Sequence, residues 1–438
     1  MNIRNSWRQG RVVISHTTIW ILSSVMLLLP LNVAHAQQSI TLEFWSQTDL
    51  AVVPVVDQLI AKFEKANPGI KVNAQHFGKW TEIWPKILTA VATKTVPDVV
   101  RIKEVHTFEL ADKGALTRLD EFAKRDGGPK RGDILPVLWD AATYKGGLYG
   151  YPQFAYVMVL FYNTEAFRKA GLDPEKPPVT WADMKAYAKK LSNPRENTWG
   201  YAPLEYGTRE MNLAWFLAHV WQAGGRLWNN DYTRVTINSP EAIRALELLV
   251  DMIKDKSMLP PDVPRTGLIE SGKIGMWGTG GWAFPTFAKY APNLRYRTAL
   301  QPKDKQHANL IGLDVMSIMK DSRNQDAAWK FVSYMNNEEN NVALAAQYGH
   351  LPVWQRALSQ PPFSTDRNWK VLVDALEHYP GVKQRCSQWD ELAEKITPHL
   401  QDAYFLRKSP KEALDAAAID ANKFWQSIGG NASKVEGR

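Results

Sequence analysis

Apolar and polar residues follow two periods along the first part of the chain, one typical of strands and one of helices. Strict alternation over residues 40–45 predicts a half-buried strand. Apolar side chains then recur three and four positions apart from Val55 to Phe63, and Asn67-Pro68-Gly69 ends that helix. Strands and helices continue to alternate, which predicts an α/β sheet with parallel strands. Further strands are expected at 70–72 and 97–102, and a further helix at 83–91.

Later segments carry similar signals. A long apolar and aromatic run occupies residues 150–163. Ser239 followed by Pro240 has the pattern of an N-cap and a first helical residue, and Ser409 followed by Pro410 repeats it. The chain contains no internal repeat and no low-complexity linker, so we expect domains joined by short crossings and not by a flexible tether.

The first 36 residues have the three regions of a secretory signal peptide. Arg4, Arg8 and Arg11 form a basic start, residues 18–31 are almost continuously apolar, and Ala34-His35-Ala36 is a small-x-small cleavage site. The apolar stretch is shorter than the roughly 20 residues that a membrane-spanning helix needs. We therefore expect cleavage after Ala36 and no membrane anchor.

Cleavage changes the size and charge of the protein. It leaves 402 of the 438 residues, and the loss of three arginines lowers the formal net charge from +8 to +5. No cysteine follows the apolar stretch, so lipid attachment at a new N-terminus is excluded. The expected product is exported and periplasmic, with secretion into the medium as the alternative.

The overall composition is that of an ordinary globular protein, with 45% apolar and 22% charged residues. These values exclude a disordered polymer, a collagen, a coiled coil and a polytopic membrane protein, and the length predicts two or three domains. A charge of +5 with no basic–aromatic repeat argues against nucleic-acid binding. The single Cys386 excludes an intramolecular disulfide and a cysteine-rich metal site.

The motifs of several enzyme classes are missing. No two histidines have the spacing of a zinc protease, so no metal site is expected. Gly278-Thr279-Gly280-Gly281 is not followed by the Lys-Ser or Lys-Thr of a P-loop, and Gly-x-Ser-x-Gly does not occur. We therefore expect a protein that is not an enzyme and has no cofactor. A secreted polysaccharide-cleaving enzyme remains an alternative, because its two carboxylates can lie far apart in sequence.

Tryptophan is unusually frequent, and 16 of the 18 lie beyond the predicted leader. An indole face suits the flat C–H face of a sugar ring, while polar side chains at its edge suit the sugar hydroxyls. Trp45, Trp80 and Trp389 have such polar neighbours in sequence, which favours carbohydrate binding. Core packing is expected of the tryptophans on apolar helix faces, which are Trp215, Trp221, Trp329 and Trp425.

Nine short motifs follow one another in order along the chain. They include Leu42-Glu43-Phe44-Trp45, Pro97-Asp98-Val99-Val100 and Gly147-Leu148-Tyr149-Gly150-Tyr151-Pro152. Taken in order, the motifs resemble extracellular solute-binding protein family 1, the maltose-binding-protein-like carbohydrate receptors of ABC transporters. The resemblance runs from Ile40 to Phe424. The other motifs lie at 63–72, 113–120, 161–167, 178–181, 271–276 and 327–331.

The resemblance implies an α/β fold of the periplasmic-binding-protein type II class, with two lobes and a three-segment hinge that closes on a ligand. It places the chain crossings at 153–156, 312–315 and 350–352. The amino-terminal lobe would comprise 37–154 and 315–350, and the carboxy-terminal lobe 155–314 and 351–438.

The resemblance also implies a ligand site between the lobes. Trp282 matches a sugar-stacking tryptophan, and Tyr156 stands where a maltose receptor has a ligand-binding carboxylate, which argues against a maltose-like ligand. Asp314 is expected either to contact the ligand or to be a hinge residue satisfied by backbone donors. Residues at the carboxyl ends of strands should face the cleft. The predicted ligand-binding residues are Trp45, Ser46, Gln47, Lys103, Glu104, Gln153, Tyr156, Glu205, Tyr206, Trp277, Gly280, Trp282, Asp314 and Trp389.

Two kinds of ligand fit this reading. The leading one is a sugar or sugar derivative, delivered to the permease subunits of an ABC importer in the inner membrane by a monomeric receptor. The alternative is an anionic ligand, such as glycerol phosphate or an acidic or sulfonated sugar, whose charge would pair with basic side chains. Those side chains are Lys79, Arg101, Lys103 and Arg209.

Overall fold

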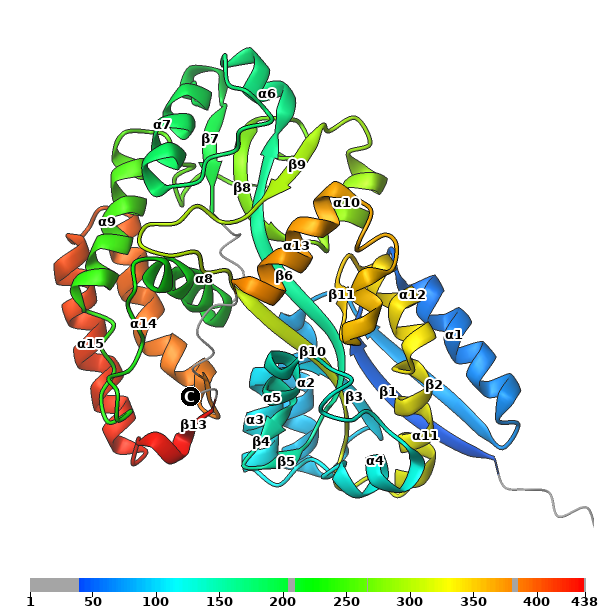
Figure 1. The fold of residues 1–438 in the computed structure, drawn as a ribbon. Helices are drawn as coiled ribbons and strands as arrows, with labels where there is room; N and C mark the ends of the chain where they lie inside the picture. The colour runs from blue at the N-terminus through cyan, green and yellow to red at the C-terminus, as the bar shows by residue number, and fades with distance from the viewer. Residues whose placement is uncertain (1–38, 204–208, 266, 380–384, 437–438) are drawn as a thin grey trace, which may run out of the picture. The chain divides into compact units, whose positions relative to one another are not determined.

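The computed structural model describes residues 39–203, 209–265, 267–379 and 385–436 (Figure 1). The predicted leader at 1–36 and the predicted ligand-binding residues Glu205 and Tyr206 lie outside the described residues.

The first three predicted strands and the helices between them are confirmed. The strands are β1 (Ile40–Gln47), β2 (Ile70–Phe77) and β3 (Val99–Lys103), and β1 pairs in parallel with both others. The intervening helices are α1 (Val53–Ala66) and α2 (Trp80–Thr93). Parallel strands joined by helices have their carboxyl ends at one edge of the sheet, so the ends of β1 and β3 lie together there.

The main sheet is mixed, so the expectation of parallel strands holds only in part. Its order is β2-β1-β3-β10-β6-β8-β7, and β9 and β11 also pair with β6. The parallel pairs are β1–β2, β1–β3 and β7–β8, whereas β10 is antiparallel to β3 and β6, and β6 is antiparallel to β8. These strands are β6 (Tyr151–Asn163), β7 (Trp199–Ala202), β8 (Ile274–Gly280), β9 (Tyr296–Ala299), β10 (Ile311–Ile318) and β11 (Leu351–Pro352).

The three predicted crossings lie side by side in this sheet, on the long strand β6 (Figure 1). Ala155 pairs with Leu313 of β10 and also with Leu351 of β11. Phe154 likewise pairs with Asp314 and Pro352. Segments that are far apart in sequence therefore form one three-stranded ladder, which we call the joint. The lobe boundaries assigned around it stay predictions.

The helix starts predicted from Ser-Pro pairs are confirmed. The Ser239 hydroxyl accepts a hydrogen bond from Ala242 N (3.3 Å), and Ser409 forms a reciprocal capping box with Glu412. The helices beyond α2 are α3 (Glu104–Asp112), α4 (Asp120–Asp126), α5 (Pro136–Ala142), α6 (Thr164–Lys169), α7 (Trp181–Leu191), α8 (Arg209–Gln222), α9 (Pro240–Lys254), α10 (Ala283–Tyr290), α11 (Gln325–Met335), α12 (Glu338–Tyr348), α13 (Arg367–His378), α14 (Trp389–Tyr404) and α15 (Pro410–Ser427).

Three 3-10 turns and two small sheets complete the described structure. The turns are Pro194–Glu196, Gln355–Ser359 and Ala432–Lys434. The small sheets pair β4 (Thr143–Tyr144) with β5 (Gly147–Leu148), and β12 (Arg385–Cys386) with β13 (Val435–Glu436).

Apolar side chains pack into two clusters on opposite faces of β6. Val157, Val159 and Phe161 belong to one cluster, whereas Met158 and Leu160 belong to the other. The predicted core tryptophans are confirmed, because all four are buried. The four tryptophans are Trp215, Trp221, Trp329 and Trp425.

Among the described helices, none combines the length and the apolar character that crossing a membrane requires.

Candidate functional site

The carboxyl end of β1 carries three predicted ligand residues, and each has a different environment. Trp45 is mostly buried, with the ammonium of Lys86 4.3 Å from its ring centre. Ser46 is buried and hydrogen-bonded to Thr48 (2.8 Å). Gln47 is half-buried, and its side-chain amide donates to the backbone of Gly78 (3.1 Å). The side chains of Trp45 and Gln47 therefore reach toward the segment that follows β2, and Ser46 faces inward.

Lys103, at the end of β3, forms a buried ion pair with Glu210 in the first turn of α8 (2.5 Å between Nζ and Oε1). Its ammonium also lies 5.2 Å from the ring centre of Trp80. Burial lowers the pKa of Lys103, but the charge and hydrogen bond of Glu210, together with the charges of Asp314 and Glu104, outweigh burial, so the pKa lies above its ordinary value. Lys103 is therefore a cation whose charge is already matched.

A second pair lies close by and joins α3 to α14. His106 Nε2 lies 3.6 Å from Asp390 Oδ2. The imidazole is stacked on the indole of Trp84, with ring centres 3.9 Å apart and planes 12° apart. Burial raises the pKa of Asp390, but the nearby His106, Lys103 and Trp84 together outweigh burial, and the pKa lies below its usual value. Two aromatic side chains of α2 thus contact these ion pairs: Trp80 contacts Lys103, and Trp84 contacts His106.

Asp314, at the second crossing, is paired with Arg101 of β3, and both side chains are almost fully buried. A second guanidinium nitrogen of Arg101 donates to the backbone oxygen of Gln47. The guanidinium carbon also lies 4.5 Å from the ring centre of Tyr348 and 5.3 Å from that of Phe154. Among the described residues, the partner of the Asp314 carboxylate is thus the side chain of Arg101 and not a backbone donor. A ligand contact by Asp314 stays a prediction.

Two further predicted ligand residues are turned toward the joint. Glu104 is buried, and its carboxylate accepts a hydrogen bond from Leu313 N of β10 (3.0 Å). Gln153 is buried and donates to Met316 Sδ (3.1 Å). The backbone oxygen of Gln153 accepts from Asn341, which also accepts from Val353 N and so links the first crossing to the residue that follows the third. A direct ligand contact by Glu104 or Gln153 stays a prediction.

Tyr156, Trp282 and His350 form an aromatic group beside the joint. Ring centres are 6.3 Å apart for Tyr156 and Trp282, 6.0 Å for Trp282 and His350, and 6.5 Å for Tyr156 and His350. Gly280 lies under the Trp282 indole, because a Cβ at Gly280 would come within 2.0 Å of that ring. Gly312 likewise leaves room for the Tyr156 ring, which a Cβ there would approach to 1.8 Å. Two of these rings, Tyr156 and Trp282, are only half-buried and can contact a ligand.

Two predicted tryptophans lie in the hydrophobic core. Trp277 is fully buried in β8, with its ring centre 6.0 Å from Phe161 and 5.9 Å from Phe287. Trp389, the first residue of α14, is also buried and belongs to the core cluster that contains Met158. The structure thus does not place Trp277 beside Trp282, although the two are close in sequence. Ligand contacts by Trp277 and Trp389 stay predictions.

Residues 49–342, more than half of the chain, match the model of the bacterial extracellular solute-binding protein family. The chain belongs to this family. A curated relative, the sn-glycerol-3-phosphate-binding periplasmic protein UgpB of Escherichia coli K12, is 23% identical over 412 residues, which cover 89% of this chain and 93% of the relative.

Solved structures show the same fold over nearly the whole chain. An ABC substrate-binding protein from Listeria monocytogenes, in complex with cycloalternan, is 25% identical with a TM-score of 0.80 and covers 89% of this chain and 99% of its own. An ABC transporter solute-binding protein from Thermotoga lettingae, bound with alpha-D-tagatose, is 27% identical with a TM-score of 0.79 and covers 88% and 99%. The predicted periplasmic-binding-protein fold is therefore confirmed. The chain is a solute-binding protein of ABC transport and not an enzyme.

Among the described residues of the solute-binding protein, several buried side-chain atoms have no hydrogen-bond partner. They include Asp390 Oδ1, Gln388 Oε1 and His106 Nδ1, together with the indole N–H of Trp45. The carboxylate and amide oxygens can only accept hydrogen bonds, and the indole can only donate. A buried polar group left without a partner costs about 1–3 kcal/mol, so pairing these atoms with water or with another polar molecule would be favourable.

Three residues of the charge pairs described above were not identified from the sequence. They are Glu210, His106 and Asp390, and each can be recognised only through an ion-pair partner that is distant in sequence. Glu210 lies 107 positions from Lys103. The proximity of Trp84 to Trp80 at helical spacing, on a segment that follows a strand end, was the available signal.

Proposed function

We propose that this solute-binding protein captures a neutral, hydroxyl-rich ligand, a sugar or sugar derivative, and delivers it to an ABC importer. The proposal rests on two features taken together. The buried cations Arg101 and Lys103 are already paired with carboxylates, and the buried acceptor oxygens of Gln388 and Asp390 have no hydrogen-bond partner. Neutral hydroxyls donate hydrogen bonds to such oxygens and also accept from an indole N–H. The half-buried indole of Trp282 supplies a flat apolar surface on which a sugar ring stacks.

Charge pairing speaks against an anionic ligand. Of the four cations considered for such a ligand, Arg101 is paired with Asp314, Lys103 with Glu210, and Arg209 with Glu394 (3.1 Å). At Arg101 and Lys103 a phosphate would have to displace a carboxylate from a buried cation, and the displaced carboxylate would lose its own partner. The pair of Arg209 and Glu394 is exposed and opposes an anion only weakly. The fourth cation, Lys79, is exposed.

Relatives support both ligand classes to different degrees. Two solved structures of at least 25% identity, from Listeria monocytogenes and Thermotoga lettingae, hold the carbohydrates cycloalternan and alpha-D-tagatose. The glycerol-3-phosphate receptor UgpB is 23% identical and keeps the anionic ligand as the second candidate. Tyr156, at the first crossing, argues against a maltose-like ligand among the sugars.

We further propose that the receptor works as a periplasmic monomer after cleavage at Ala36. Permease subunits of the inner membrane would bind it preferentially when its lobes have closed on a ligand. The permease can sense that a ligand is bound only if it binds the closed form of the receptor more tightly than the open form. The lobes would be those assigned above, 37–154 with 315–350 and 155–314 with 351–438.

A thermal-shift screen tests the proposal. Neutral mono- and oligosaccharides and polyols are compared with glycerol 3-phosphate, since a ligand at 100 times its Kd adds about 2.7 kcal/mol to stability. We expect stabilisation by a neutral compound that persists in high salt. Stabilisation by glycerol 3-phosphate alone, weakening with salt, would establish the anionic alternative. Release of new reducing ends from oligosaccharides would instead contradict the assignment as a receptor.

A further inference from the structure

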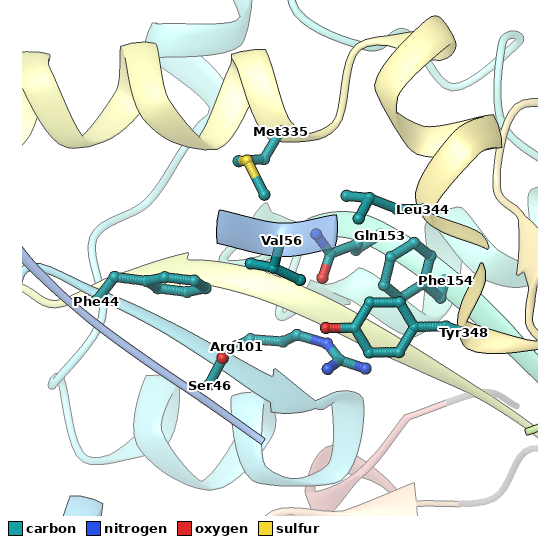
Figure 2. A pocket seen from close by; sticks show the side chains of 9 residues that line it. All are labelled: Phe44, Ser46, Val56, Arg101, Gln153, Phe154, Met335, Leu344 and Tyr348. Carbon is teal, nitrogen blue, oxygen red and sulfur yellow. The ribbon is translucent and has the colours of Figure 1, made fainter. Parts of the chain in front are cut away.

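A small cavity lies beside the joint and is lined by both polar and apolar side chains. Arg101, Gln153 and Tyr348 contribute polar groups, and Met335 and Leu344 are among the apolar residues. The cavity offers about 10 Å³ to a water-sized molecule, near the lower limit for holding one water. Figure 2 shows the polar ends of Arg101, Gln153 and Tyr348 turned toward the same space, with Met335 and Leu344 on its other side.

Two of these side chains keep unused hydrogen-bonding capacity. Arg101 donates from its terminal nitrogens to Asp314 and to the backbone of Gln47, but its Nε has no partner. Gln153 donates from Nε2 to Met316, but its Oε1 has no partner. Both residues are about 2% exposed. The cavity is therefore bordered by one buried donor and one buried acceptor, each of which is costly to leave unpaired.

We propose that this cavity is a built binding site for one water molecule. The water accepts a hydrogen bond from Arg101 Nε and donates one to Gln153 Oε1. The Tyr348 hydroxyl donates to Thr48 Oγ1 (3.1 Å), so its oxygen is available to accept the second proton of the water. Three partners are typical of a buried structural water.

The position of this water gives it a part in the receptor's movement. Arg101 already contacts the second crossing through Asp314 and the ligand-facing end of β1 through Gln47. The water adds the first crossing, through Gln153, and Tyr348 precedes the third crossing by two residues. One hydrated guanidinium then connects the end of β1 to all three crossings.

A high-resolution crystal structure of the ligand-free protein tests the site directly. We expect one ordered, low-mobility water within hydrogen-bonding distance of Arg101 Nε and Gln153 Oε1. The proposal is overturned if the density shows no water there, or if the two side chains pair directly with each other.

A cavity-filling variant gives a second, independent test. Val56 lines the cavity, so Val56→Ile should displace the water and lower the Tm. The decrease in Tm caused by Val56→Ile should be markedly smaller in a Gln153→Leu background, because the Gln153→Leu substitution has already removed the acceptor of the water. Equal costs in the two backgrounds would show mere overpacking and contradict the proposal. Val55→Ile, a neighbouring half-buried position outside the cavity lining, is the matched control and should change the Tm little.

Discussion

Strand β3 carries two buried cations, Arg101 and Lys103, two residues apart, and they are held in different ways. Arg101 is paired with Asp314 of the adjacent strand β10, which is fixed to β3 by the sheet ladder itself. Lys103 is paired with Glu210 of α8, a helix with no strand pairing to β3. The Arg101–Asp314 ion pair thus joins two hydrogen-bonded strands of one sheet, whereas the Lys103–Glu210 ion pair joins a strand to a helix outside the sheet. Only the second can separate without disrupting the sheet.

The largest effect is expected from Asp314→Ala. It leaves the Arg101 charge buried without its carboxylate, which should lower the free energy of unfolding by about 3–5 kcal/mol. Urea denaturation followed by tryptophan emission measures the loss. The matched control is Asp140→Ala, which removes an exposed pair with Arg131 (2.8 Å) and should cost less than about 1 kcal/mol. Similar losses in the two variants would refute the assignment of Asp314 to the joint.

Lys103→Met should cost less, about 1–2 kcal/mol, because α8 can move away and let water reach Glu210. We also expect a larger radius of gyration by solution scattering, since one contact that holds α8 near β3 is lost. Lys103→Met combined with Glu210→Gln should recover part of the stability, because no carboxylate is then left unpaired. If Lys103→Met cost as much as Asp314→Ala with no change in scattering, the two pairs would be equivalent and the comparison would fail.

Trp282→Ala tests the aromatic group beside the joint. Loss of a stacking face worth about 0.5–1.5 kcal/mol should weaken binding of the best neutral ligand by a factor of roughly 2 to 10, with little change in the free energy of unfolding. Isothermal titration calorimetry measures the affinity, and Trp282→Phe should retain part of it. Trp139→Ala, at a half-buried position on α5, serves as the control with unchanged affinity. Unchanged binding in Trp282→Ala would remove this residue from the site.

The smallest effect concerns His350, which follows α12 at the third crossing. Burial lowers the pKa of His350 below its ordinary value of 6.5, and nearby Arg101 acts in the same direction, while Asp314 opposes it. The unfolded chain binds this proton more readily, so stability is full above about pH 6.5 and declines as the pH falls below it.

We expect the Tm to fall by a few degrees between about pH 7 and about pH 5 through this residue. His350→Gln should flatten that part of the profile, whereas the exposed His378→Gln should leave it unchanged. If the wild type and His350→Gln had identical profiles, the titration of His350 would not contribute to stability in this pH range.

The sequence predicted the elements of this fold more fully than the partners of its charged residues. Local patterns identified β1, α1 and the caps of α9 and α15, because periodicity and capping depend on neighbours in the chain. The mixed order of the sheet was not predicted, since β10 and β3 are brought together from opposite parts of the sequence. Arg101 and Asp314, 213 positions apart, could not be matched from either residue alone.

Side-chain direction was the other limit on predicting the site. Trp45, Ser46 and Gln47 follow one another at a strand end, yet Ser46 alone is turned toward the cavity beside Arg101. Trp277 and Trp282 are close in sequence, but the first lies on the inner face of β8 and the second follows the strand's end. One residue of register decides which face a strand residue occupies, and the sequence alone did not define that register.

The double pairing of Ala155 has a mechanical consequence. Strand β6 is bordered at this residue by β10 on one edge and by β11 on the other, so neither edge is free. A rotation here can be accommodated as a change of twist spread along three strands, while the inter-strand hydrogen bonds persist. The joint would then act as a torsion spring, and its backbone amides should exchange slowly with solvent in both the open and the closed receptor.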